Sequence, residues 1–273
     1  MTTESVSSAN KLVLRYWNCA GRGMLMRYMA YDAGLNFVDD IVDFEKDFLG
    51  GTWESTKKYI PELAGPFKAL PVVQHNGSTI NETGACAQYI AEIAGYMPKS
   101  PLDRARVIMI CDHIYEDILI NISYGLWGFR EWDRDVIGGF AGPTSGLPLK
   151  FVNLENTLAE SASGFAVGNE ISMADFAIFY IVDILTQRML EVESGTEAVK
   201  LLLGDKPFIA AHQKMMLARP NISKYRNSAQ WKKYGPYISG LGVMGNRTHE
   251  LELGETELEG IETLASKLVS CLR

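Results

Sequence analysis

Apolar and polar residues first alternate between positions 11 and 17, the pattern of a short β-strand with one buried face. From position 24 to 33 the apolar side chains recur at helical spacing, although Asp32 interrupts the apolar face, and Gly34 is well placed to end this helix. Residues 37–42 are again typical of a strand. The pattern therefore predicts a strand, a helix and a second strand in this order.

The clearest local signal in the sequence is a β-hairpin. The segments 71–75 and 78–81 flank the dipeptide Asn76-Gly77. Both residues of this pair tolerate the positive φ angles that a two-residue type I′ turn requires, so we expect two antiparallel strands joined by a tight turn.

Helical segments surround the hairpin. A short one is expected at residues 53–59, between two loops rich in Gly and Pro, and a longer one at about 83–93, closed by Gly95. The order β-α-β-α-β-β-α predicts a small mixed sheet covered by helices. We therefore expect a thioredoxin-like domain at residues 10–96.

The pattern changes after this domain. Residues 103–121 and 176–189 both carry apolar side chains at helical spacing, and no convincing strand pattern returns. The second of these helices follows the segment 172–175, Ser-Met-Ala-Asp, which has the form of a capping box. We expect an all-helical domain at residues 97–240, so the fold class is α/β plus all-α.

Two segments differ from this helical pattern. Residues 138–148 are rich in Gly and Pro and predict a loop between helices. Residues 241–273 form an acidic C-terminal extension that ends in an amphipathic stretch, which predicts a terminal helix docked on the body of the protein.

The length and charge of the chain limit its class. Its 273 residues exceed the usual length of one domain, and a hydrophobic content of 47% is enough for a sizeable core. The net charge of -7, without a Lys/Arg cluster, disfavours nucleic acids and anionic membranes as partners. The apolar segment 176–185 is interrupted by Asp183 and is too short to span a bilayer, and residues 1–10 have no signal-peptide pattern. We expect a cytoplasmic protein.

Cysteine and histidine residues give no sign of a metal centre or a disulfide framework. The four cysteines include no CxxC pair, and the four histidines are far apart in the sequence. We expect reduced thiols, no metal and no bound cofactor.

Tyr16 ends the first strand and is soon followed by Gly21-Arg22-Gly23. This opening resembles that of the cytosolic glutathione transferases of the tyrosine type, most closely the sigma class. The resemblance implies that the Tyr16 hydroxyl binds the sulfur of glutathione and favours the thiolate, the attacking species. It places Arg22 near the glycyl end of the tripeptide or in a supporting salt bridge. By itself, a tyrosine in such a strand would more often be a core residue.

Further matches to the family extend along the first domain. The resemblance implies that Trp53 and Lys57, one helical turn apart, bind the glycyl carboxylate, and that Leu70 binds the cysteinyl part through its backbone before a cis-proline, Pro71. It further implies that Glu82 and Thr83 bind the γ-glutamyl end of glutathione. It also implies a homodimer in which Asp112 of one subunit contacts the γ-glutamyl end in the other. A helix start at Thr83 would suit a carboxylate, although Thr83 alone is also an ordinary N-cap.

The resemblance implies an enzyme that conjugates glutathione, its co-substrate, to a small hydrophobic electrophile. Apolar pockets form at domain interfaces, which makes Tyr115, Tyr124 and Trp127 the candidates for the electrophile site. Two other hypotheses stay open. One is a non-catalytic binding or structural protein with the same fold, and the other is a thiol-disulfide oxidoreductase with Cys19 as nucleophile.

Overall fold

The computed structural model describes residues 11–43, 47, 61–119, 146–190, 200 and 202–234, and all structural statements below concern this part of the chain. Its N-terminal elements, in chain order, are β1 (Leu12–Trp17), the 3-10 turn η2 (Gly21–Gly23), α1 (Met24–Asp32), β2 (Phe37–Val42), α3 (Pro61–Ala64), β3 (Val72–His75), β4 (Ser78–Asn81) and α4 (Thr83–Ala94).

The four strands form one mixed sheet in the order β2-β1-β3-β4. Strand β1 pairs in parallel with β2 and antiparallel with β3, and β3 and β4 form the hairpin. The turn residues Asn76 and Gly77 have φ angles of 50° and 75°, as a type I′ turn demands. The predicted strands, the hairpin and the thioredoxin-like arrangement are confirmed.

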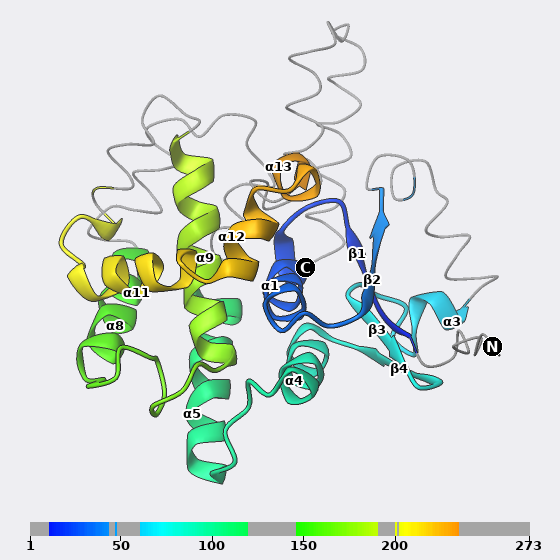
Figure 1. Ribbon diagram of the computed structural model, residues 1–273, viewed down its shortest axis with the longest axis horizontal. Coiled ribbons are helices and arrows are strands. Elements are labelled where there is room, and N and C mark those ends of the chain that lie inside the picture. Colours follow the sequence, from blue (N-terminus) through cyan, green and yellow to red (C-terminus); the bar gives the residue numbers. More distant parts are fainter. Residues whose placement is uncertain are drawn as a thin grey trace, which may run out of the picture.

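The C-terminal region is helical. Its elements are α5 (Pro101–Asp112), the π-helical segment η4 (His113–Leu119), α8 (Gly146–Ala159), α9 (Met173–Leu190), α11 (Pro207–Leu217), α12 (Pro220–Arg226) and α13 (Ala229–Tyr234). Figure 1 shows α9 running through the middle of this region, with α1 and α4 between it and the sheet. The predicted fold class, α/β plus all-α, is confirmed. Within the described residues, no helix is both long and apolar enough to cross a membrane.

The predicted loop at 138–148 is wrong at its end, because α8 already begins at Gly146. Pro148 does not prevent this helix, since the backbone N–H groups of a first helical turn have no partner within the helix and proline loses nothing there. The predicted helix at 103–121 also differs, because the α-helix gives way to a π-helical segment at His113.

The capping box before α9 is present in a modified form. The buried carboxylate of Asp175 accepts hydrogen bonds from the backbone N–H of Ser172 at 2.8 Å and from the N–H of Ala166 at 2.7 Å. The Ser172 hydroxyl also donates to this carboxylate, at 2.9 Å, whereas the usual box has the hydroxyl as acceptor. Asp175 therefore ties the preceding loop to the start of the longest helix.

Helix α1 connects the two regions, and it packs against α4, α9 and α12. Asp32, which interrupts the apolar pattern, is buried and paired with Arg219. Asp183 in α9 is likewise buried, and it accepts hydrogen bonds from the Tyr28 hydroxyl at 2.7 Å and from Arg226 Nε at 3.0 Å. Both acidic residues that interrupt the apolar pattern of the sequence, Asp32 and Asp183, thus form ion pairs inside the packed region.

Candidate functional site

Tyr16 lies near the end of β1, with its ring packed among Cys19, Trp17 and Leu70. Its side chain is buried, and its hydroxyl oxygen accepts a hydrogen bond from the backbone N–H of Arg22 at 2.9 Å. Burial raises the pKa of the Tyr16 hydroxyl well above its ordinary value, although the Arg22 N–H opposes this shift. The hydroxyl therefore keeps its proton at neutral pH and can donate it in a hydrogen bond.

The turn η2 presents the Arg22 N–H to Tyr16, and tyrosines of the helical region hold this turn. The Tyr180 hydroxyl, from α9, donates to the Gly21 carbonyl at 2.6 Å. The Tyr115 hydroxyl, from η4, donates to the Arg22 carbonyl at 3.4 Å. The Arg22 side chain lies beside Glu116, with Nη1 3.6 Å from Oε1. The structure therefore brings together three predicted site residues, Tyr16, Arg22 and Tyr115.

Arg27 is a neighbour of Tyr16 that the sequence analysis missed. Its guanidinium is buried against Asp39, with Nε 3.0 Å from Oδ1, and it donates to the carbonyls of Cys19 at 2.6 Å and Trp17 at 3.1 Å. Its Cζ atom lies 5.7 Å from the centroid of the Tyr16 ring, within range of a cation–π contact. The sequence offered one signal for Arg27, namely an arginine among the apolar residues of α1.

The peptide bond between Leu70 and Pro71 is cis, as the resemblance implies. The side chain of Asn81 fixes the loop before it, since its Nδ2 donates to the carbonyls of Ala64 at 3.0 Å and Ala69 at 2.6 Å. Leu70 also packs against Tyr16 and Cys19. Pro71, the residue before β3, thus lies next to the tyrosine site, and Asn81 is a second residue that sequence reasoning missed.

The helix α4 begins at Thr83 after an unusual backbone conformation at Glu82. Glu82 has a φ angle of 68° with ψ at 134°, which is rare for a residue with a side chain. Its side chain makes no capping hydrogen bond to the helix start among the described residues. Thr83 is the first helical residue and is not itself the N-cap. The start of α4 therefore keeps the uncapped backbone N–H groups that suit a carboxylate.

Asp112 ends α5 and is exposed, on the helix face that also carries the exposed side chains of Leu102 and Met109. The predicted site residues Trp53, Lys57, Tyr124 and Trp127 lie outside the described residues, as does the extension at 241–273. Within the described part of the chain, no group of three His, Cys, Asp or Glu residues could hold a metal ion. Cys19 is buried, which is a poor setting for thiol-disulfide exchange.

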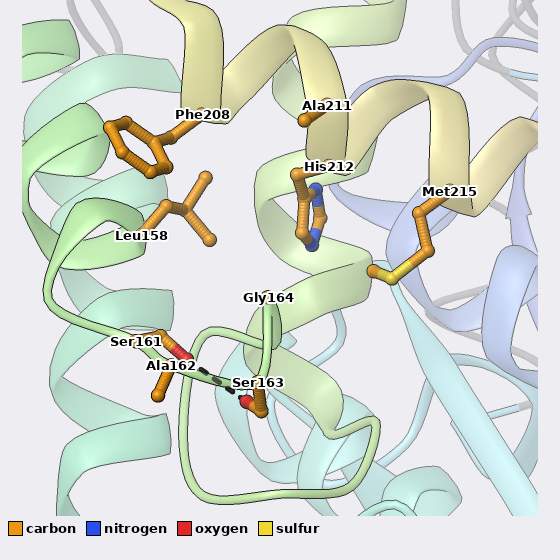
Figure 2. A pocket seen from close by; sticks show the side chains of 9 residues that line it. All are labelled: Leu158, Ser161, Ala162, Ser163, Gly164, Phe208, Ala211, His212 and Met215. Carbon is orange, nitrogen blue, oxygen red and sulfur yellow. Dashed lines mark hydrogen bonds between the residues drawn. The ribbon is translucent and has the colours of Figure 1, made fainter.

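A surface pocket of about 380 Å³ lies in the helical region, between the end of α8, the loop that follows it and α11. Figure 2 shows His212 and Met215 from α11 on one side and the hydroxyls of Ser161 and Ser163 on the other, 2.9 Å apart. The lining includes none of the predicted site residues. The pocket is therefore separate from the group around Tyr16.

Comparisons with known proteins agree with this architecture. Residues 144–229 match the family model "Glutathione S-transferase, C-terminal domain". Probable glutathione S-transferase 6 of Caenorhabditis elegans is 27% identical over 216 residues, which cover 78% of this chain and 93% of that protein. Glutathione S-transferase P 1 of Xenopus laevis is 27% identical over 218 residues, which cover 79% and 92% of the two chains.

The solved structure of a pi-class glutathione S-transferase from Onchocerca volvulus has the same fold, with a TM-score of 0.67 at 18% sequence identity. The match covers 85% of this chain and 99% of that one. None of these three proteins is named as a sigma-class enzyme, the class that the sequence resembles most closely. The thioredoxin-like sheet, the helical region and these relatives together show that the chain is similar to glutathione S-transferases and shares their fold.

Proposed function

We propose that this protein is a tyrosine-type glutathione transferase, closest to the sigma class, in which Tyr16 activates glutathione for attack on a hydrophobic electrophile. The observation that carries the proposal is the buried Tyr16 hydroxyl, which accepts a hydrogen bond from the Arg22 N–H at 2.9 Å, and whose pKa is raised by burial. A neutral hydroxyl can donate its hydrogen bond to a thiolate, and this donation favours the thiolate over the thiol.

The reaction needs a thiolate at neutral pH. A free thiol titrates near 8.5, so a shift of about two pH units, roughly 2.7 kcal/mol, would ionise most of the bound glutathione. The thiol proton passes to solvent and the sulfur lone pair forms a bond to carbon. In a substitution the bond from that carbon to its leaving group breaks, and the leaving group departs with the electron pair.

We expect the rest of glutathione to bind to residues of the thioredoxin-like region. The backbone of Leu70, before the cis bond to Pro71, would bind the cysteinyl part, and the start of α4 at Thr83 would bind the γ-glutamyl carboxylate. Glu82 would accept from the γ-glutamyl ammonium. Trp53 and Lys57 would bind the glycyl carboxylate, with Arg22 nearby.

The electrophile site would lie where the helical region meets η2. Tyr115 supports this position because its hydroxyl reaches the Arg22 carbonyl, and Tyr124 and Trp127 would complete an apolar wall. No metal or further cofactor is needed for this chemistry, because the protein supplies a hydrogen-bond donor and glutathione supplies the nucleophile.

We further propose a cytoplasmic homodimer in which Asp112 reaches the partner's glutathione site. The support is an exposed stripe on α5, where Leu102 is 61% and Met109 62% exposed beside Asp112. Phe67 is 68% exposed in the loop before Pro71. Large apolar side chains exposed in this way are typical of an interface.

The variant Tyr16→Phe tests the proposal. It removes the hydroxyl and keeps the ring, so conjugation of 1-chloro-2,4-dinitrobenzene should fall by roughly 100-fold in kcat/KM while glutathione still binds. Tyr225→Phe, which removes another buried tyrosine hydroxyl, is the matched control. An undiminished rate for Tyr16→Phe would refute the role of Tyr16. If the wild-type protein failed to bind immobilised glutathione, a non-catalytic role would be supported instead.

A further inference from the structure

Tyr180 and Tyr16 are connected through a single peptide unit. The Tyr180 hydroxyl donates to the carbonyl oxygen of Gly21 at 2.6 Å, and the N–H of the same peptide, which belongs to Arg22, donates to the Tyr16 hydroxyl at 2.9 Å. One tyrosine thus binds one end of the peptide dipole and the other tyrosine binds the opposite end. Tyr180 comes from α9 in the helical region and is completely buried.

Hydrogen bonds in such a chain strengthen one another. A donor at the carbonyl oxygen polarises the peptide and makes its N–H a better donor, by an estimated 10–30% per bond. Burial favours this effect because no water competes for these groups, and the low local dielectric increases each electrostatic contribution. A stronger bond from the Arg22 N–H withdraws charge from the Tyr16 oxygen, so the Tyr16 hydroxyl becomes a better donor in turn.

We propose that Tyr180 is a positioning residue for catalysis, which orients and polarises the Gly21–Arg22 peptide and thereby strengthens the hydrogen bond that Tyr16 gives to the thiolate of glutathione. This inference rests on the proposed function of Tyr16. It assigns to a buried side chain of the helical region a part in the chemistry of the thioredoxin-like region.

Tyr115 provides an internal comparison. Its hydroxyl also reaches the turn η2, but it binds the Arg22 carbonyl, at 3.4 Å, which belongs to the next peptide unit. That peptide does not include the Arg22 N–H. The rings of Tyr115 and Tyr180 are neighbours, with centroids 6.4 Å apart, and both side chains are buried. Loss of the Tyr115 hydroxyl should therefore leave the Arg22 donor, and with it the pKa of the bound thiol, unchanged.

The variants Tyr180→Phe and Tyr115→Phe test the proposal through the pKa of the bound glutathione thiol, followed by the ultraviolet absorbance of the thiolate. We expect Tyr180→Phe to raise this pKa by about 0.4 unit and Tyr115→Phe to leave it as in the wild type. Below that pKa, the conjugation rate of Tyr180→Phe should fall about two- to three-fold. Well above it, the rates of Tyr180→Phe and the wild type should meet.

Three outcomes separate the possibilities. A wild-type pKa in Tyr180→Phe, or a rate loss that is equal at every pH, would overturn the inference and leave the role of Tyr16 intact. A bound thiol with the pKa of free glutathione in the wild-type protein would instead refute the proposed function itself. A shift confined to Tyr180→Phe supports the inference.

A second measurement does not depend on the folding of Tyr180→Phe. If the peptide transmits polarisation, it does so in both directions, so Tyr16→Phe should move the carbonyl carbon NMR resonance of Gly21 upfield. An unchanged Gly21 resonance in Tyr16→Phe would contradict the coupling.

Discussion

Gly23 faces the ring of Tyr16 so closely that a Cβ atom on Gly23 would lie 2.4 Å from Cδ1 and 2.6 Å from Cγ of the tyrosine. The variant Gly23→Ala should therefore displace the Tyr16 ring, whose hydroxyl we propose to be catalytic. Because a shift of about 1 Å in a reacting group costs roughly 100-fold in rate, we expect kcat/KM for conjugation to fall by about this factor.

Gly146→Ala is the control for this variant, since among the described residues the added Cβ would meet only Lys150 Cε, at 3.6 Å. It should keep the wild-type rate. Gly23→Ala with full activity would show that Tyr16 adjusts freely, or that the ring position is not critical.

The buried pair of Arg27 and Asp39 should show strong energetic coupling. Arg27→Met leaves the Asp39 carboxylate buried without its cation, and we expect the free energy of unfolding to fall by about 3–5 kcal/mol. The double variant Arg27→Met/Asp39→Leu removes both charges and should lose less than the sum of the two single variants. Urea unfolding of the four proteins measures this coupling, and additive losses would contradict it.

Asp175 should contribute more to stability than an acid at the equivalent place in α5. It accepts hydrogen bonds from Ser172 and Ala166 inside the protein, so Asp175→Ala should lower the free energy of unfolding by about 3 kcal/mol. The Asp103 carboxylate, also in a first helical turn, forms a salt bridge with Arg106 at the surface, with Nη1 3.0 Å from Oδ1. Asp103→Ala should change the free energy of unfolding by less than about 1 kcal/mol. Thermal or urea unfolding of the two variants measures both losses, and equal losses would contradict the prediction.

The protein should lose stability at alkaline pH. Burial raises the pKa of several tyrosines in the folded state, namely Tyr16, Tyr28, Tyr115, Tyr180 and Tyr225. In the unfolded chain they titrate near 10, so their contribution is complete below about pH 10. Above it the unfolded state releases protons that the folded state keeps, and the free energy of unfolding falls by about 1.4 kcal/mol per pH unit for each tyrosine.

Urea unfolding between about pH 9 and pH 11, with phenolate absorbance as the probe, checks this prediction. Tyr225→Phe should make the fall in the free energy of unfolding above pH 10 less steep by about 1.4 kcal/mol per pH unit, the contribution of one tyrosine. Ordinary titration near pH 10 in a protein that stays folded would contradict it.

The local elements could be predicted from the sequence because their signals are short-range. The Asn76-Gly77 turn sets the hairpin by itself, and Gly95 at a φ of 78° ends α4 as expected. The predicted end of the loop at 138–148 is wrong, because the sequence does not distinguish a proline in a first helical turn from a proline in a loop.

The electrostatic part of the site could not be predicted in the same way. In the sequence, Asp32 is visible only as an interruption of an apolar face, because its partner Arg219 lies 187 residues later in the chain. The link from Tyr180 to Gly21 spans 159 residues and involves a backbone carbonyl, which has no signature in the sequence. The resemblance to a family suggested Tyr16 as a site residue, whereas the groups that contact it could be found only in the three-dimensional structure.

Eight of the nine residues of α1 are buried, and they include the apolar residues at 24–26, Tyr28 and Met29. A recombinant fragment that ended at residue 96 would expose the side of α1 that packs against α9 and α12, and it would leave Asp32 without Arg219. Such a fragment would aggregate or unfold. For the same reason, a chimaera that takes its helical half from a related glutathione S-transferase must also match the residues of α1 that contact this half.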